Sequence, residues 1–211
     1  MKRMPEPESA RSEHLSAVPH ALSAQDRSAH YGHQGAVLWF TGLSASGKSS
    51  LAMALERALT GMGYSCYVLD GDNVRKGLNS NLGFSPQDRS ENIRRVGQVA
   101  ALFADAGLIC ITAFISPYRA DREQARMASA QSFHEIHIAT ALAACEARDP
   151  KGLYKKARSG ELDEFTGISA PYEVPLQAQL RLDTEHEALE TSLDKLLAYV
   201  LQAIPLQAAR R

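Results

Sequence analysis

The stretch AVLWFTGLSASGKSS, residues 36–50, decides the fold of this chain. Residues 36–41 form an apolar run that a glycine closes, which is typical of a strand buried on both faces of a sheet. The residues that follow, GLSASGKS, match the pattern GxxxxGK[ST], and a helical pattern over 47–62 comes directly after them. Strand, loop and helix in this order are the context that a nucleotide phosphate-binding loop requires.

The residues of this loop have the chemistry that a triphosphate needs. Glycines at 42 and 47 let the backbone turn so that consecutive N–H groups point inward, and the following helix presents its positive end to the anion. Lys48 would reach the β- and γ-phosphates of ATP, and Ser49 would bind the Mg²⁺ ion that bridges them. The predicted ATP-binding residues of the loop are Gly42, Leu43, Ser44, Ala45, Ser46, Gly47, Lys48 and Ser49.

Apolar runs and amphipathic stretches alternate through the rest of the chain. The candidate strands are 36–41, 65–69, 108–115, 134–138 and 179–182, and the main candidate helices are 47–62, 86–106 and 185–203. Right-handed crossovers place helices on both faces of a parallel sheet, so we expect a three-layer α/β/α domain of the P-loop NTPase type. Its sheet would have five mainly parallel strands, with ligands at their carboxyl ends.

The length of 211 residues favours one domain with short flanking segments. Residues 1–34 are polar and lack periodicity, which predicts a flexible N-terminal arm. The arm contains four histidines, His14, His20, His30 and His33. Because these histidines are irregularly spaced, we interpret them as solvated side chains and not as a metal cluster. The domain would span residues 35–205, and residues 206–211 would form a C-terminal tail.

Composition excludes several classes of function. With 23 basic and 24 acidic side chains the formal charge is −1, which disfavours binding to nucleic acid or to an anionic membrane. No apolar stretch is long enough to cross a bilayer, and the first residues lack the apolar core of a signal peptide. Cys66, Cys110 and Cys145 are an odd number without CxxC spacing, which predicts inert thiols in the cytoplasm.

The second strand ends in LDGDNVR, which places Asp70 and Asp72 close to the phosphate-binding loop. Two carboxylates at a strand end suit Mg²⁺ binding and the acceptance of a proton from an attacking hydroxyl. We predict that Asp70 and Ser49 bind the Mg²⁺ ion and that Asp72 accepts the proton of the attacking hydroxyl. The sequence leaves open which of the two aspartates is the base. A GTPase is disfavoured because the chain has no NKxD motif.

Four longer stretches of the sequence indicate the function more specifically than the phosphate-binding loop does. They are DGDNVRKGLNSNLGFSPQDRSENIRRV over 70–96, FISPYRADR over 114–122, CEARDPKGLYKKARSGELDEFTG over 145–167, and APYEVP over 170–175. With these runs, in this order, the chain after residue 35 resembles the adenylylsulfate kinase family. The resemblance implies transfer of the ATP γ-phosphoryl group to the 3′-hydroxyl of adenosine 5′-phosphosulfate (APS), giving 3′-phosphoadenylyl sulfate and ADP in sulfate activation.

The resemblance also implies a second nucleotide site. Arg75, Arg89 and Asn92 match positions that bind the phosphosulfate, and a guanidinium suits tetrahedral oxyanions. Phe84 and Phe165 match aromatic residues that sandwich the acceptor adenine, although without the resemblance each phenylalanine would be interpreted as core. The remaining residues assigned to the acceptor are Asp70, Ile115, Ser116 and Lys151.

Two further assignments concern Ser116 and the segment 148–170. The family implies a phosphoserine intermediate at Ser116, whereas direct in-line transfer would need this residue only for positioning, and we favour direct transfer. The segment 148–170 starts basic and ends acidic, and we expect a lid that excludes water. Arg148 would lie near ATP and Lys151 near the acceptor. Without the resemblance, a solvated helical hairpin would be the better interpretation.

Partners follow from the resemblance alone. It implies a homodimer and leaves room for association with a separate ATP sulfurylase, because this chain is too short to contain that second enzyme. Two alternatives stay open at this stage. One is another P-loop kinase of nucleotides or small metabolites, against which the acceptor-site residues argue. The other is a non-catalytic nucleotide-binding regulator, against which intact Lys48, Ser49, Asp70 and Asp72 argue.

Overall fold

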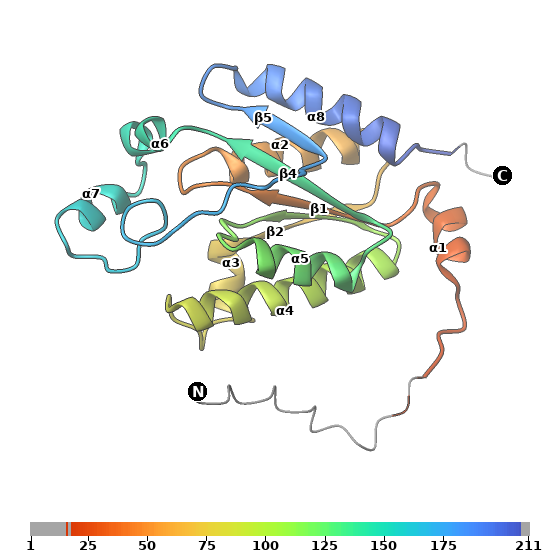
Figure 1. The fold of residues 1–211 in the computed structure, drawn as a ribbon. Coiled ribbons are helices and arrows are strands. Elements are labelled where there is room, and N and C mark those ends of the chain that lie inside the picture. The colour runs from red at the N-terminus through yellow and green to blue at the C-terminus, as the bar shows by residue number, and fades with distance from the viewer. Residues whose placement is uncertain (1–15, 17, 208–211) are drawn as a thin grey trace.

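Five parallel strands form one sheet in the order β2-β3-β1-β4-β5 (Figure 1). The computed structural model describes residue 16 and residues 18–207. The strands are β1 (Ala36–Thr41), β2 (Cys66–Asp70), β3 (Ile109–Ala113), β4 (Phe133–Ala139) and β5 (Leu180–Asp183). All four strand pairings are parallel, which confirms the predicted α/β sheet.

Helices cover both faces of the sheet, as the crossover rule predicts (Figure 1). The helices are α1 (Ala24–Tyr31), α2 (Lys48–Gly61), α3 (Gly71–Lys76), α4 (Pro86–Asp105), α5 (Arg119–Ala128), α6 (Leu142–Arg148), α7 (Leu153–Arg158) and α8 (Leu189–Ala203). Helices α2 and α8 pack on one face, and α4 and α5 pack on the other. In the part of the chain described here, no helix is both long and apolar enough to cross a membrane.

Strand β1 lies at the centre of the sheet and is buried along its whole length. Its side chains alternate between the two layers, with Leu38 and Phe40 in the core under α2 and α8, and Val37 and Trp39 in the core under α4 and α5. Burial on both faces explains why its sequence is an unbroken apolar run. The carboxyl end of this rigid strand carries the phosphate-binding loop.

Helix α4 shows the predicted apolar stripe and a close approach to α5. Its residues Ile93, Val96 and Ala100 are buried in the core. A Cβ atom on Gly97 would lie 2.9 Å from the Cα and Cβ atoms of Ala125 in α5, so only glycine lets these helices pack so closely. The helix begins at a Ser85 cap whose hydroxyl accepts the Asp88 N–H, and its first turns reach the carboxyl edge of the sheet.

The N-terminal region differs from the prediction of an arm up to residue 34. Helix α1 forms within it because Ser23 and Asp26 make a capping box at its start and Gly32 ends it in a left-handed conformation. His33 is fully buried rather than solvated, and its Nε2 accepts the Ser65 N–H at 3.0 Å. His20 and His30 are exposed as expected, and His14 lies outside the described residues.

The C-terminal helix begins later than its periodicity predicts. The Asp183 carboxylate accepts the N–H groups of Glu185 and His186, which holds these residues in a turn, and α8 starts at Leu189. After the helix, Gln207 donates its N–H to the Gly32 carbonyl, so the described part of the predicted tail contacts the end of α1. Residues 208–211 lie outside the described range.

The three thiols are free, and two are fully buried. Burial raises the pKa of Cys110 to about 12 and also raises the pKa of Cys145. Cys66 is only partly buried, less than its apolar run predicts, because β2 is an edge strand. Burial still raises its pKa, which leaves all three groups protonated and weakly nucleophilic at neutral pH.

Candidate active site

The phosphate-binding loop connects β1 to α2 and depends on its two glycines. A Cβ atom on Gly42 would lie 2.5 Å from the Ile138 carbonyl oxygen, so no larger residue fits there. Gly47, the residue directly before α2, has a φ of 98°, in the left-handed region that glycine favours. The loop thus turns tightly between a buried strand and a helix N-terminus, where backbone N–H groups are free for an anion.

Lys48 folds back over the loop that carries it. Its Nζ donates to the carbonyl oxygens of Gly42 at 3.0 Å and Leu43 at 2.6 Å, and to Ser46 Oγ at 3.3 Å. The side chain is buried, and this burial lowers the pKa of Lys48 from 10.5 to about 8, against a smaller effect from neighbouring acidic groups. Its carbonyl partners are neutral, so the ammonium charge is available to a phosphate.

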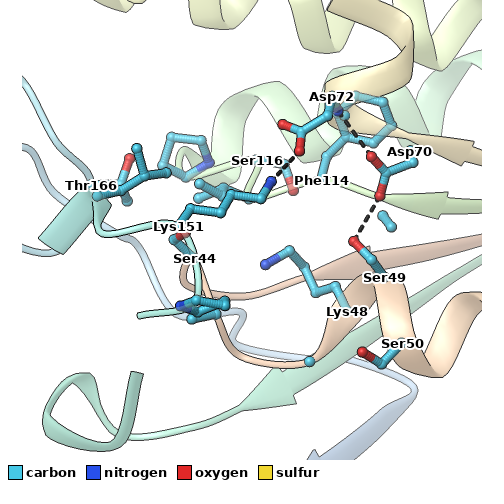
Figure 2. Close-up of a pocket in the computed structure, with 18 of the residues that line it drawn as sticks. Ser44, Lys48, Ser49, Ser50, Asp70, Asp72, Phe114, Ser116, Lys151 and Thr166 are labelled. Carbon is cyan, nitrogen blue, oxygen red and sulfur yellow. Dashed lines mark hydrogen bonds and ion pairs between the residues drawn. The ribbon is translucent and has the colours of Figure 1, made fainter. Parts of the chain in front are cut away.

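The two aspartates differ in their partners, which the sequence could not decide. Asp70 Oδ2 accepts from Ser49 Oγ at 2.7 Å, and Asp70 Oδ1 accepts the Asp72 N–H at 3.0 Å (Figure 2). The Asp72 carboxylate instead forms an ion pair with Lys151 across the cavity. Figure 2 shows Lys48 and Lys151 reaching the same space from opposite sides, Lys48 from α2 and Lys151 from the predicted lid.

Arg75 and Arg89 line the same cavity as Asp72. Arg75 lies 4.4 Å from the centroid of the Phe84 ring and donates to the Gly83 carbonyl at 2.8 Å. Arg89 donates its Nε to the Phe84 carbonyl at 2.8 Å. Both guanidinium groups keep N–H donors that these contacts do not use. Phe84 is 64% exposed, so part of its ring is open to a ligand.

Arg89 also joins helix α4 to the end of the lid. Its two terminal nitrogens donate to Thr166 Oγ1 and to the Glu164 carbonyl. Thr166 is buried and lines the cavity, and it was not among the site residues predicted from the sequence. It stands directly beside the predicted Phe165 in the run FTG, and only the fold shows that its hydroxyl faces Arg89.

Asn92 is buried in α4 and lines the same cavity. Its Oδ1 accepts from Nδ2 of Asn79, at 2.9 Å, and Asn79 is completely buried. Asn79 follows α3 in the turn GLNSN and was not among the site residues predicted from the sequence. Its contact with Asn92 joins two segments that are separate in sequence.

Ser116 lies just beyond the carboxyl end of β3 and is buried, with a φ of 41° that is unusual for a residue with a side chain. Its hydroxyl accepts from Trp39 Nε1 at 3.1 Å, and its carbonyl accepts from Arg122 Nη1 at 2.7 Å. Arg122 is itself buried and forms an ion pair with Glu135 on β4 at 2.6 Å. These contacts hold the strained backbone in place.

The predicted lid, residues 148–170, begins at the last residue of α6, contains α7 and lies at the carboxyl edge of the sheet (Figure 1). The Tyr154 hydroxyl of α7 donates to the Ser44 carbonyl of the phosphate-binding loop at 3.0 Å. The Phe165 ring packs edge-on against the Tyr154 ring with centroids 5.0 Å apart. Arg148 donates to the Thr184 carbonyl at the end of β5, so the lid contacts the loop and the strand ends together.

One cavity of roughly 800 Å³ joins most of the predicted residues. Of the sequence-selected set, the residues that line it are Ser44, Ala45, Gly47, Lys48, Ser49, Asp70, Asp72, Arg75, Phe84, Arg89, Asn92, Ile115, Ser116, Arg148, Lys151 and Phe165. Gly42, Leu43 and Ser46 do not line it, and they contribute through their contacts with Lys48. Several other lining residues were not predicted from the sequence, among them Phe114, Thr166, Thr184 and Leu189.

Known proteins have sequences related to this chain over most of its length. Residues 34–183 match the family described as adenylylsulphate kinase. An adenylyl-sulfate kinase of Staphylococcus epidermidis is 53% identical over 190 residues, which cover 90% of this chain and 96% of that protein. An adenylyl-sulfate kinase of Yersinia pestis is 58% identical over 185 residues, covering 87% of this chain and 86% of that protein.

Solved structures agree with the sequence comparison. The APS kinase of Mycobacterium tuberculosis, solved in complex with AMPPNP and APS, matches with a TM-score of 0.76 and 48% identity, covering 79% of this chain and 98% of that chain. A hexameric APS kinase from Thiobacillus denitrificans matches with a TM-score of 0.63 and 34% identity, covering 82% of this chain and 30% of that chain. By sequence and by fold, the chain belongs to the adenylylsulfate kinase family.

Proposed function

We propose that this protein transfers the γ-phosphoryl group of ATP to the 3′-hydroxyl of APS, giving 3′-phosphoadenylyl sulfate and ADP. The observation that carries the proposal is that one cavity is lined both by Lys48 of the phosphate-binding loop and by Arg75 of α3 and Arg89 and Asn92 of α4. Two anionic nucleotides can therefore meet within this cavity, which Asp72 also lines. Family membership supports the same reaction.

ATP would bind with its β- and γ-phosphates against the loop N–H groups and Lys48. Arg148, beside the Thr184 carbonyl at the cavity rim, would contact the donor nucleotide. A Mg²⁺ ion fits Ser49 and Asp70, because a hydroxyl and a carboxylate oxygen already lie 2.7 Å apart there and hard oxygen donors suit this cation. When bound, Mg²⁺ would supply positive charge to the phosphate oxygens.

APS would bind on the other side of the cavity. The free N–H donors of Arg75 and Arg89 would bind the phosphosulfate together with Asn92, since charge-assisted hydrogen bonds to oxyanions are strong. The exposed ring of Phe84 and the ring of Phe165 would hold the adenine between them. These contacts would orient the 3′-hydroxyl toward ATP.

In phosphoryl transfer the protein contributes positioning and charge stabilisation and little covalent chemistry. The 3′-oxygen of APS forms a bond to the γ-phosphorus while the bond from that phosphorus to the β–γ bridging oxygen breaks, and ADP leaves. We assign the hydroxyl proton to the Asp72 carboxylate, because both oxygens of Asp70 already accept hydrogen bonds, one from the Ser49 hydroxyl and one from the Asp72 N–H. Lys151, now paired with Asp72, would turn to the acceptor nucleotide once it binds.

Ser116 and Ile115 would position the acceptor at the end of β3. The buried Ser116 hydroxyl accepts from Trp39 and still has a proton to donate to a substrate oxygen. This arrangement supports direct transfer over a phosphoserine intermediate. The lid would exclude water from the cavity while the phosphoryl group is between the two oxygens.

Assembly and location are proposed on the resemblance only. We infer a homodimer, with association with a separate ATP sulfurylase as a further partner, and a role in sulfate assimilation in the cytoplasm. Light scattering after size-exclusion chromatography would measure the mass, and a monomer or a hexamer would contradict the dimer.

The function is tested by ADP release from Mg-ATP with APS, AMP or adenosine as acceptor. We expect turnover only with APS and a product phosphorylated at the 3′ position. Arg75→Ala should raise the KM for APS and leave the KM for ATP nearly unchanged. Turnover with AMP, or ATP hydrolysis with no acceptor, would overturn the proposal and leave another P-loop kinase or an ATPase.

A further inference from the structure

Asn79 lies behind Asn92 and is not part of the cavity wall. It is completely buried in the turn after α3, where its N–H donates to the Val74 carbonyl at 3.0 Å and its carbonyl accepts the Leu82 N–H at 3.1 Å. Backbone bonds on both sides of the turn therefore fix the position from which its side chain reaches α4. That side chain contacts Asn92 through Nδ2, which donates to Asn92 Oδ1 at 2.9 Å.

This contact decides which half of the Asn92 amide is left for a ligand. An asparagine amide has two halves of nearly equal shape, an oxygen that accepts hydrogen bonds and an NH₂ group that donates them. Asn79 donates to Oδ1, and no hydrogen bond joins the Asn92 NH₂ group to another described residue, so this group is the half of Asn92 that is left for a ligand in the cavity that Arg75 and Arg89 also line. An NH₂ group binds an oxyanion, whereas a carbonyl oxygen repels it.

The burial of Asn79 has a cost that a packing role would not require. Its Oδ1 is buried with no hydrogen-bond partner among the described residues. Such an orphaned acceptor is unfavourable, and a leucine of similar shape would fill the space without it. The useful part of the side chain is thus its NH₂ group, and the one side-chain oxygen that this group reaches among the described residues is Asn92 Oδ1.

We propose that Asn79 is a positioning residue that sets the orientation of the Asn92 amide, so that Asn92 donates to the anionic part of the acceptor nucleotide. The inference rests on the proposed function, because it takes APS as the acceptor. Asn79 acts only through Asn92 and does not touch substrate. Its removal should therefore weaken APS binding without changing the ATP side of the cavity.

Asn79→Asp is the sharpest variant. A carboxylate at this position can only accept, so it would bond with the NH₂ group of Asn92 and turn Asn92 Oδ1 toward the phosphosulfate. We expect the KM for APS to rise about tenfold or more, the change expected when a hydrogen bond to a charged group is lost. The KM for ATP should stay within about twofold of the wild type, a change of less than about 0.5 kcal/mol.

Asn79→Leu is the companion variant, and it covers the case in which a buried carboxylate prevents folding. It removes the donor and the orphaned acceptor together, so thermal stability should be retained while the Asn92 amide is free to turn. We expect a smaller rise in the KM for APS than in Asn79→Asp. Equal rises in both KM values, or a loss of stability with both KM values unchanged, would overturn the positioning role.

A double-mutant cycle with Asn92→Ala separates positioning from a general effect on the site. Once the Asn92 amide is gone, Asn79→Asp or Asn79→Leu should raise the KM for APS no further. A full additional rise in the Asn92→Ala background would overturn the inference. A wild-type protein that is inactive with APS would overturn the proposed function and this inference with it. An active wild type with unchanged Asn79 variants overturns the inference alone.

Discussion

Trp39 and Ser116, 77 positions apart in the sequence, are joined by a buried hydrogen bond in which Trp39 Nε1 donates to Ser116 Oγ at 3.1 Å. In the described residues, no carboxylate or imidazole bonds this hydroxyl. A nucleophilic serine is usually activated by an adjacent base, which can take its proton. The tryptophan N–H is only a donor, so this contact fixes the hydroxyl without activating it.

Ser116→Ala should therefore keep substantial turnover, within about tenfold of the wild type, whereas Asp72→Asn should lower kcat by about a hundredfold or more, the contribution typical of a general base. Both are measured by ADP release with APS at saturating substrate. A dead Ser116→Ala, together with radiolabelled phosphate on the wild-type protein that transfers to APS, would contradict direct transfer.

The activity should depend on the protonation of Lys48. Burial lowers its pKa to about 8, and the charged form is the one that binds phosphates. The kcat/KM for ATP, which reports the free enzyme, should then fall as the pH rises through about 8, instead of near 10.5 as for an ordinary lysine. A pH profile from about 7 to about 10 measures this.

Two controls assign that decline to Lys48. In a Lys48→Arg variant the guanidinium stays charged over the whole pH range, so the residual kcat/KM for ATP should be flat. In the wild type, the kcat/KM for APS at saturating ATP should lack the same decline, because bound phosphates keep Lys48 protonated. A decline that persists unchanged in Lys48→Arg would assign it to another group.

The buried Arg122–Glu135 ion pair should be important for stability. Its side chains are 3% and 9% exposed, and Arg122 also donates to the Ser116 carbonyl. Glu135→Gln would leave the Arg122 guanidinium without its closest carboxylate, so we expect the free energy of unfolding to drop by about 3 kcal/mol. Urea denaturation would measure the change.

Glu91→Gln is the matched control. Glu135 pairs with two arginines, Arg122 and Arg126, and Glu91 likewise pairs with Arg94 and Arg95, but at the surface of α4. Partly exposed pairs contribute little, so we expect a loss below about 1 kcal/mol. Equal losses in the two variants would show that burial does not set the strength of the Glu135 pair.

Lid closure should be visible in limited proteolysis. Lys155, Lys156 and Arg158 of α7 are exposed, and the next residues lead to Gly160. We expect trypsin to cut here several-fold more slowly with ADP and APS bound together than without nucleotide. Cleavage at Arg27 in α1, away from the cavity, is the internal reference and should not change. Equal cutting near Gly160 in both conditions would count against closure.

Strong local patterns explain how much of the molecule was predictable. The run at β1 is apolar because the strand is buried on both faces, and the loop after it needs glycine where a Cβ atom would meet the Ile138 carbonyl. The α4 stripe follows from the helical period. Helix α1 was not predicted because its residues are mostly polar and form no apolar face. Its capping box at Ser23 and Asp26 is a weaker sequence signal than an apolar face would be.

The sequence by itself determined the parts whose signal is local: the strand–loop–helix unit with Lys48 and Ser49, the five-stranded α/β class, and the motif runs that place the chain in its family. Only the tertiary structure decided the pairings between distant segments, Asp70 with Ser49, Asp72 with Lys151 and Asn79 with Asn92. The periodicity of the sequence around a residue determines which helix or strand the residue belongs to and which face of it the residue occupies. The residue's partner across the cavity depends on how separate elements pack, and that is set by the whole core at once.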